Sequence, residues 1–253
     1  LEDTLKLDIP LNSKEGFVRQ IIGWREFVRH VHESTNGFEV EDGELSSRSG
    51  AGWEGEWSSS RVTPNVLAND FDLPPTYWGE KSGMLCLDTA VSDVVETGYA
   101  HHIPRLMVLA NIGNLLGINP RELTDWFWAM FTDAYDWVVE PNVLAMGTYA
   151  VGDVMTTKPY VSGTPYIKKM GDYCGDCSLH FKKSCPISDM YWNFLEENQS
   201  HFAKNHRMAM PMRTLAKRTQ EAKDTAKKVT EYVRTQMSKG LKLDPVELES
   251  IKA

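Results

Sequence analysis

Three cysteines stand close together in the second half of the chain and could ligate a metal. Cys174, Cys177 and Cys185 follow the pattern C-x2-C-x7-C, and Pro186 comes directly after the last of them. A C-x2-C step brings two thiolates to one side of a turn, and a Cys-Pro step is common at the end of ferredoxin-type cluster loops. Cys86 stands alone, far earlier in the chain. The four thiols predict one shared metal site.

The spacing of the cysteines leaves the kind of metal site open. Disulfides are improbable in a chain that looks cytosolic. A redox-active C-x2-C motif calls for a thioredoxin-like βαβ context, which this sequence lacks. Four thiolates suit structural zinc as well as they suit an iron–sulfur cluster. From spacing alone the two are equally compatible with the sequence.

Tryptophan content and charge add further hints about function. Eight Trp in 253 residues is more than core packing demands, so aromatic stacking or electron transfer becomes a candidate role. The net charge of −8 argues against a protein that coats nucleic acid generally. Positive charge is concentrated over residues 204–228, and because binding is local, a basic groove is compatible with this net charge.

Nothing in the sequence is typical of a secreted or membrane protein. No apolar run approaches the roughly 20 residues that cross a bilayer. The start of the chain has neither a basic region nor an apolar one that would form a signal peptide. We therefore expect a cytoplasmic protein, with no membrane partner. Because the chain does not begin with Met, we also expect it to be part of a longer protein.

The apolar residues predict helices that would position these side chains. They recur at spacings of three and four over residues 12–33, about 85–139 and 188–239, as in amphipathic helices. Residues 34–75 and 141–187 are rich in turn-forming residues and are predicted to be irregular. No run of alternating β-branched residues predicts a strand. The sequence therefore predicts an all-α fold.

Two local features refine this outline. Gly117, Asn119 and Pro120 predict a sharp break within the second helical region, since Gly closes a helix, Asn caps the next one and Pro suits its first turn. The last predicted helix, over about 214–239, is mostly charged and carries only a thin apolar stripe. We expect that helix to lie at the surface.

Several motifs occur in a fixed order along the chain. Residues 20–27 read QIIGWREF, residues 97–107 read TGYAHHIPRLM, and Asp136 precedes Asn142 in a segment that leads to the Y-C-x2-C loop. In order and spacing these resemble the W-R-E-F helix, the flavin-binding segment and the Asp…Asn pair of the photolyases and cryptochromes. With the cysteine loop, they are most similar to the iron–sulfur bacterial members. The resemblance covers about residues 12–213.

The resemblance implies a fold, a set of cofactors and a division of the chain. It implies a C-terminal helical FAD-binding and catalytic domain over residues 1–213, with a cluster loop at about 170–190, and a charged helical extension over 214–253. The family's N-terminal α/β antenna domain, which holds a lumazine or pterin chromophore, is expected to be missing from this chain. FAD in a bent conformation and one [4Fe–4S] cluster are implied, the cluster ligands being Cys86, Cys174, Cys177 and Cys185.

The resemblance also assigns roles around the flavin. It implies that Arg105 and Asp136 form the ion pair across the flavin ring, and that Asn142 faces the ring nitrogen N5. Trp24 is implied as a flavin contact and as the aromatic wall of the pocket that receives the DNA lesion.

The resemblance assigns catalysis and electron transfer to further residues. His101 and His102 match the histidines that pass a proton to the lesion, and a ring with an ordinary pKa of about 6.5 can do so at cellular pH. Trp78 and Trp126 match the tryptophans that carry electrons from the surface to the flavin. With Trp24, the two histidines form the implied catalytic set.

The function implied by the resemblance is light-driven DNA repair by a lyase. The excited reduced FAD passes an electron to a (6-4) pyrimidine photoproduct in ultraviolet-damaged DNA, after the lesion has been flipped out of the duplex. We expect a monomer. The Ser-rich helix start that grips the FAD diphosphate is not found before residue 20, so weak FAD binding is expected, and this chain could be inactive by itself.

Two alternatives stay open at this point. A blue-light-sensing cryptochrome would carry the same cofactors without repair activity. A zinc-stapled, DNA-binding helical module would have no redox chemistry. His101 and His102 favour repair over signalling, whereas the cysteine spacing alone does not separate iron from zinc.

Overall fold

The computed structural model describes residues 1–41, 44–46 and 64–253. Within these residues the regular secondary structure is helical, apart from one short antiparallel hairpin and an isolated bridge between Phe71 and Ile118. The expected all-α class is confirmed. Part of the irregular connection predicted over 34–75, including residues 47–63, lies outside the described residues. No helix in the described part of the chain is long and apolar enough to cross a membrane.

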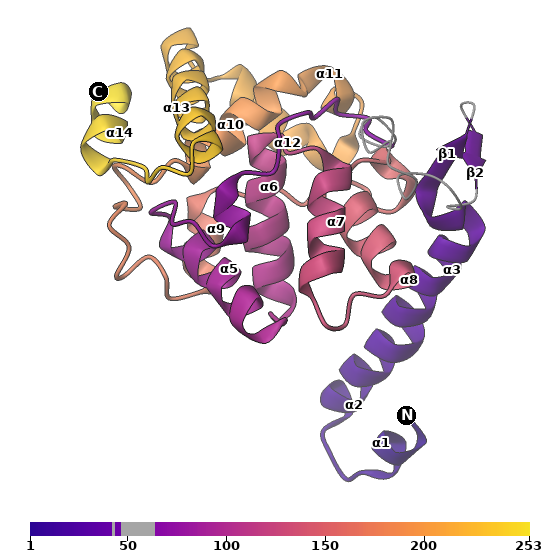
Figure 1. The fold of residues 1–253 in the computed structure, drawn as a ribbon. Helices are drawn as coiled ribbons and strands as arrows, with labels where there is room; N and C mark the ends of the chain where they lie inside the picture. Colours follow the sequence, from indigo (N-terminus) through magenta and orange to yellow (C-terminus); the bar gives the residue numbers. More distant parts are fainter. Residues whose placement is uncertain (42–43, 47–63) are drawn as a thin grey trace.

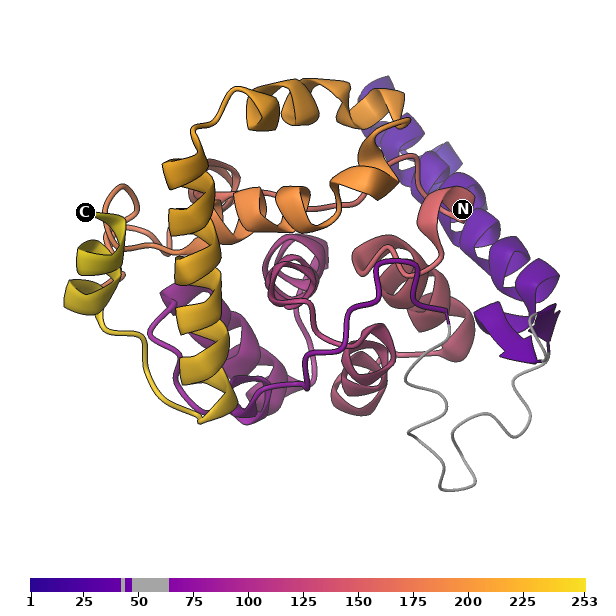
Figure 2. The ribbon, with the colours of Figure 1, turned by 90° about the horizontal axis from the view of Figure 1, so that it is seen from above.

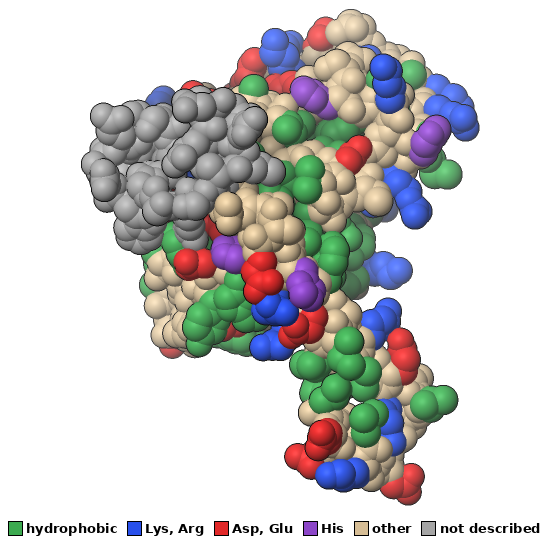
Figure 3. Space-filling model, turned by 90° about the vertical axis from the view of Figure 1, so that its right-hand side faces the viewer, with side chains coloured by type: hydrophobic (Ala, Val, Ile, Leu, Met, Phe, Trp, Pro, Cys, Tyr) green, Lys and Arg blue, Asp and Glu red, His purple; other side chains and the backbone are tan. Residues whose placement is uncertain are grey.

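The N-terminal part forms a long helical arm that projects from the body (Figure 1). Its elements are α1 (Glu2–Lys6), α2 (Leu11–Val18), the π-helix η1 (Arg19–Arg25), α3 (Glu26–Thr35), the 3-10 helix η2 (Asn36–Phe38) and the strands β1 (Glu39–Glu41) and β2 (Glu44–Ser46). From α2 to α3 the helix is continuous, as the periodicity over 12–33 predicts. Hydrophobic side chains gather on the projecting end, including the exposed Leu5, Leu11 and Phe17 (Figure 3).

The centre of the molecule is a group of packed helices. They are η3 (Pro75–Trp78), α5 (Leu85–Thr97), the π-helix η4 (Pro104–Ala110), α6 (Asn111–Leu116), α7 (Pro120–Met130), α8 (Asp136–Val139) and the π-helix η5 (Glu140–Gly147). The predicted break is confirmed: Gly117 closes α6 with φ +72°, and the Asn119 side chain accepts hydrogen bonds from the first backbone N–H groups of α7. Leu109, Ile112 and Leu116 are fully buried in this core.

The C-terminal part completes the same core. It consists of η6 (Gly152–Val154), α9 (Thr164–Met170), α10 (Ile187–Glu197), α11 (Gln199–Phe202), η7 (His206–Met208), α12 (Ala209–Ala216), α13 (Gln220–Ser238) and α14 (Pro245–Lys252). Helix α13 packs along α10, on the side of the molecule opposite the N-terminal arm (Figure 2). The apolar stripe of α13 is thin, but its residues Val229, Val233 and Met237 are fully buried. This helix, expected at the surface, therefore belongs to the main core along one face.

A second, smaller core ties the arm to the body. Val28 of α3 and Phe38 are buried there against Leu106 of η4 and Leu144 of η5. The arm thus contacts the body along α3, where the sequence alternates apolar and charged residues with the period of a helix. A cavity lies beside this second core, and four of the side chains singled out in the sequence line it: Trp24, His102, Arg105 and Asn142.

Candidate functional site

The cavity has a volume of about 360 Å³. Its wall is mostly apolar and aromatic, and it is built from the arm, from the segment that leads into η4, from the end of α7 and from α8 with η5. A concave apolar space with a few placed polar groups is the usual form of a cofactor site. The polar groups that line it include those of Trp24, His102, Arg105, Asp133 and Asn142.

Arg105 is held in the cavity wall by a carboxylate that the sequence did not single out. Its Nη1 and Nη2 donate to Oδ1 and Oδ2 of Asp133, both at 2.9 Å. The guanidinium also lies 4.3 Å from the centre of the Phe131 ring and donates from Nε to the backbone oxygen of Ala100. A bidentate pair of this kind fixes orientation as well as charge.

The expected partner of Arg105 was Asp136, whereas the carboxylate that holds Arg105 in this structure is that of Asp133. The backbone N–H of Thr132 donates to the carbonyl of Gly98 at 3.0 Å, which draws the turn after α7 toward the segment that carries Arg105. Asp133 follows directly in that turn, whereas Asp136 lies in the first turn of α8 and is not among the residues that line the cavity. The position of Asp133 right after the end of a helix was the one local signal that could have found it.

Trp24 and Asn142 come from distant parts of the chain and contact each other in the cavity wall. The indole Nε1 of Trp24 donates to Oδ1 of Asn142 at 3.2 Å. Asn142 in turn donates from Nδ2 to the backbone oxygen of Val138 at 2.7 Å, which fixes its amide on the helix that carries it. The two residues expected at the flavin therefore share one wall.

The two adjacent histidines both reach solvent, but their surroundings differ. His102 lines the cavity, and partial desolvation together with the positive charge of Arg105 lowers its pKa from the ordinary value of 6.5. The Nδ1 of His101 accepts from the backbone N–H of Ile103 at 3.4 Å, and this ring is not part of the cavity wall. Only His102 of this pair faces the cavity.

Trp126 lies between this cavity and a second one. Its indole is almost fully buried, donates to the carbonyl of Tyr77 at 2.8 Å and packs edge-on against Phe127 and Phe131, which line the first cavity. Trp126 also lines the second cavity, together with Trp78, which is 58% exposed. Trp126 therefore contacts the aromatic wall of the first cavity, and it lines the second cavity together with the exposed Trp78.

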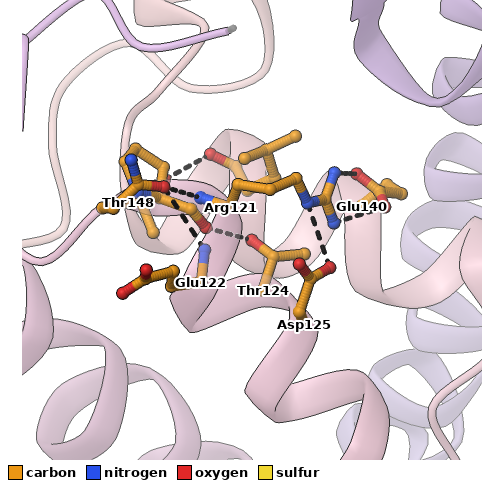
Figure 4. Close-up of polar contacts among 9 residues, drawn as sticks. Arg121, Glu122, Thr124, Asp125, Glu140 and Thr148 are labelled. Atoms are coloured by element: carbon orange, nitrogen blue, oxygen red, sulfur yellow. Dashed lines mark hydrogen bonds and ion pairs between the residues drawn. The ribbon is translucent and has the colours of Figure 1, made fainter. Parts of the chain in front are cut away.

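A buried ion-pair network holds two helices that border the cavity (Figure 4). Arg121 of α7 contacts Oε1 of Glu140 on η5 at 2.9 Å and Oδ1 of Asp125 at 3.0 Å. Glu140 is 1% exposed and stands two residues before Asn142. The network therefore sets where Asn142 lies relative to the aromatic side chains of α7.

The four cysteines, predicted to share a metal site, lie around one small space. All four line one small cavity between α5, α9 and the loop that precedes α10. Burial, with the other three thiols adding to it, raises the pKa of Cys86. In the described residues, no three His, Cys, Asp or Glu side chains form a group that could hold a metal ion.

The cysteine cavity also has neighbours that the sequence reasoning missed. Thr164 has its hydroxyl 3.3 Å from the sulfur of Cys185. Lys252, four positions after the buried Leu248 in the last helix, donates to the backbone oxygen of Cys185 at 2.8 Å. No local pattern distinguishes either residue, because both contacts depend on how the chain folds back on itself.

Comparison with known proteins shows which proteins this chain is similar to. No protein-family model matches it. It is 36% identical over 233 residues to a (6-4) photolyase of Agrobacterium fabrum, which covers 89% of this chain and 41% of that protein. It is 29% identical over 123 residues to the uncharacterized protein R855 of Acanthamoeba polyphaga mimivirus, over 49% of this chain and 97% of that protein.

Fold and cavity define a helical domain with a ligand-sized aromatic cavity and a separate four-cysteine pocket. The chain belongs to the photolyase/cryptochrome family. It spans about two fifths of the length of the (6-4) photolyase that it matches.

Proposed function

We propose that this chain is the flavin-binding, catalytic part of a photolyase that repairs (6-4) photoproducts in ultraviolet-damaged DNA. The observation that carries the proposal is the convergence of Trp24, His102, Arg105 and Asn142 on one cavity. These residues come from separate elements, and a common cavity is what a shared ligand requires. The name of the Agrobacterium relative supports the same substrate.

The residues of the cavity fit a flavin ring and a flipped base. The aromatic and apolar wall would stack on planar rings, and the Arg105–Asp133 pair would place fixed donors and charge at their edge. Asn142, oriented by Val138 and Trp24, would offer its amide to a ring nitrogen. A bound reduced flavin supplies light-driven one-electron transfer. His102 would hold or donate a proton at its ring nitrogen, with His101 beside it in the chain.

Trp126 and Trp78 are proposed as the electron route to this cavity. The buried indole contacts the aromatic wall, and the exposed one reaches solvent. Charge can pass between such neighbouring aromatic rings without any movement of the helices. The contact of Trp126 with the aromatic wall, and the position of the exposed Trp78 in the same second cavity, support the role expected from the sequence for the two tryptophans.

For the four cysteines we propose a [4Fe–4S] cluster. The donor set fits, since four thiols face one cavity and ligation by four cysteines is the usual form of such a cluster. Four thiolates suit structural zinc as well, and metal analysis of the purified protein separates the two. The expected monomeric state and cytoplasmic location stay predictions.

FAD titration of two aspartate variants tests the cavity. Asp133→Asn should weaken FAD binding by about tenfold, because it removes a charge-assisted pair worth about 1.5 kcal/mol. Asp136→Asn is the matched control and should bind within about twofold of the unchanged chain. Flavin fluorescence during titration reports both. Equal binding of the two variants, or no saturable FAD binding by the unchanged chain, would overturn the proposed site.

Repair is tested separately on the flavin-loaded protein. Under blue light, an oligonucleotide with one (6-4) photoproduct should return to normal thymines, measured by chromatography. A bound flavin that is photoreduced without any repair would instead identify the signalling alternative.

A further inference from the structure

Cys185 is contacted from outside the cysteine loop by two side chains that no motif assigns. Lys252 of α14 donates from Nζ to the backbone oxygen of Cys185 at 2.8 Å. Thr164, the first residue of α9, brings its hydroxyl to 3.3 Å from the sulfur of the same cysteine. One contact therefore holds the backbone of the residue, and the other reaches its ligand atom.

The Lys252 contact is well enclosed. The Lys252 ammonium also pairs with Oδ2 of Asp189 at 2.7 Å, and the two side chains are only 18% and 19% exposed. Asp189 lies in the first turn of α10, directly after the cysteine loop. One ammonium group thus joins the last helix of the chain, the end of the loop and the start of α10. A partly buried charge with two acceptors is held more firmly than a surface pair.

The Thr164 contact is buried and oriented. The residue is 3% exposed, and its backbone N–H donates to the hydroxyl of Ser188 at 3.1 Å, which fixes the start of α9 against α10. In the thiol form of Cys185 either atom could be the donor. Once the sulfur is a metal-bound thiolate, it has no proton, and only the Thr164 hydroxyl can donate.

We propose that Lys252 and Thr164 are positioning residues for a cluster bound at Cys185, so that the C-terminal helix α14 is part of the metal site. This inference rests on the cluster proposed above. Lys252 fixes the backbone of the ligand, which should slow loss of the cluster. The Thr164 hydroxyl donates to the thiolate, which stabilises the more negative reduced form and should raise the reduction potential.

Iron release tests Lys252. Protein purified without oxygen is mixed with an iron chelator, and the loss of absorbance near 400 nm is followed. Lys252→Met should lose iron about tenfold faster, in line with the usual cost of removing an outer partner of a metal ligand. Lys252→Arg should restore slow release. Lys242→Met, at an exposed lysine of the same segment, is the control and should match the unchanged protein. Equal rates for all variants would overturn the role of Lys252.

The reduction potential of the cluster tests the role of Thr164. Loss of packing alone would not shift this potential in a defined direction, whereas loss of the hydroxyl donor should. Thr164→Val keeps the volume and removes the donor, so its potential should shift to more negative values in a redox titration followed by electron paramagnetic resonance. Thr164→Ser keeps the donor and should stay near the original potential. An unchanged potential in Thr164→Val would overturn the role of the hydroxyl.

Metal analysis of the unchanged protein separates failure of the proposed cluster from failure of the positioning role. Iron with equal behaviour of all variants refutes this inference and leaves the proposed cluster intact. Zinc in place of iron refutes the cluster and the effect on the potential, and zinc release from the Lys252 variants then decides the positioning role. Absence of both metals refutes both proposals.

Discussion

His102 and Arg105 line the same cavity, and their proximity makes the stability of the fold depend on pH. Partial desolvation and the nearby guanidinium lower the pKa of His102 below 6.5, so the ring is mostly neutral at pH 7 in the folded chain. Below pH 6.5 the unfolded chain binds this proton more readily than the folded one. Stability should therefore fall as the pH drops from about 6.5 through the folded pKa.

The His102 shift can be measured directly. In a nuclear magnetic resonance titration, the ring proton of His102 should show a midpoint below 6.5. Arg105→Gln should move that midpoint upward, because it removes a positive charge near the ring. Arg207→Gln, at an exposed position outside the cavity wall, is the control and should leave it unchanged. A midpoint at or above 6.5 in the unchanged chain would contradict the assignment.

At the scale of elements, the network around Arg121 decides how α7 and η5 meet (Figure 4). The Arg121 side chain is 13% exposed, and Glu140 is 1% exposed, so neither charge is well solvated. The two groups also form a second contact, from Nη1 to Oε2 at 3.2 Å. A buried charge that has lost its partner keeps the full cost of desolvation. Removing one member of the pair should therefore lower the free energy of unfolding more than replacing both members by apolar residues.

Urea unfolding tests this network. Glu140→Leu should lower the free energy of unfolding by about 3–5 kcal/mol, because it leaves the Arg121 guanidinium buried with less compensation. The double variant Arg121→Met with Glu140→Leu should lose less than the sum of the single variants. Glu231→Leu, from the exposed pair with Lys227 on α13, is the control and should change stability by less than about 1 kcal/mol. A loss below about 1 kcal/mol for Glu140→Leu would show that the network does not hold the two helices together.

For the molecule as a whole, the question is whether residues 214–253 form a dispensable extension. Helices α13 and α14 bury Val229, Val233, Met237 and Leu248 completely. At about 1.5–3 kcal/mol for each large apolar side chain, their removal should cost roughly 6–12 kcal/mol. That is comparable with the whole stability of a typical domain, about 5–15 kcal/mol.

Truncation tests this estimate. A chain of residues 1–213 should show no cooperative thermal unfolding by circular dichroism, because α10 loses the helix that covers it. A chain that lacks residues 1–10 is the matched control: α1 buries no residue, so its midpoint should stay close to that of the full chain. If residues 1–213 instead unfold cooperatively at the original temperature, the division at residue 213 expected from the sequence is right.

The sequence by itself determined much of the local structure of this protein and named the candidate groups for its chemistry. Periodic apolar residues placed the arm helix, and Gly117 with Asn119 placed the break between α6 and α7, because both signals act within a few residues. Among the residues that the motifs singled out, Trp24, His102, Arg105 and Asn142 line the first cavity, and the four cysteines line another. Their roles in binding and catalysis stay predictions.

Tertiary structure alone decided which partners those groups have. The turn after α7 brings Asp133 to Arg105, a pairing that the sequence did not predict. The packing of α13 against α10 turned a mostly charged helix into part of the core, and the path of the last helix placed Lys252 at Cys185. Helical periodicity shows which face of a helix is apolar but not what covers it. Contacts between residues far apart in the chain depend on the whole packing, and that information is absent from any local pattern.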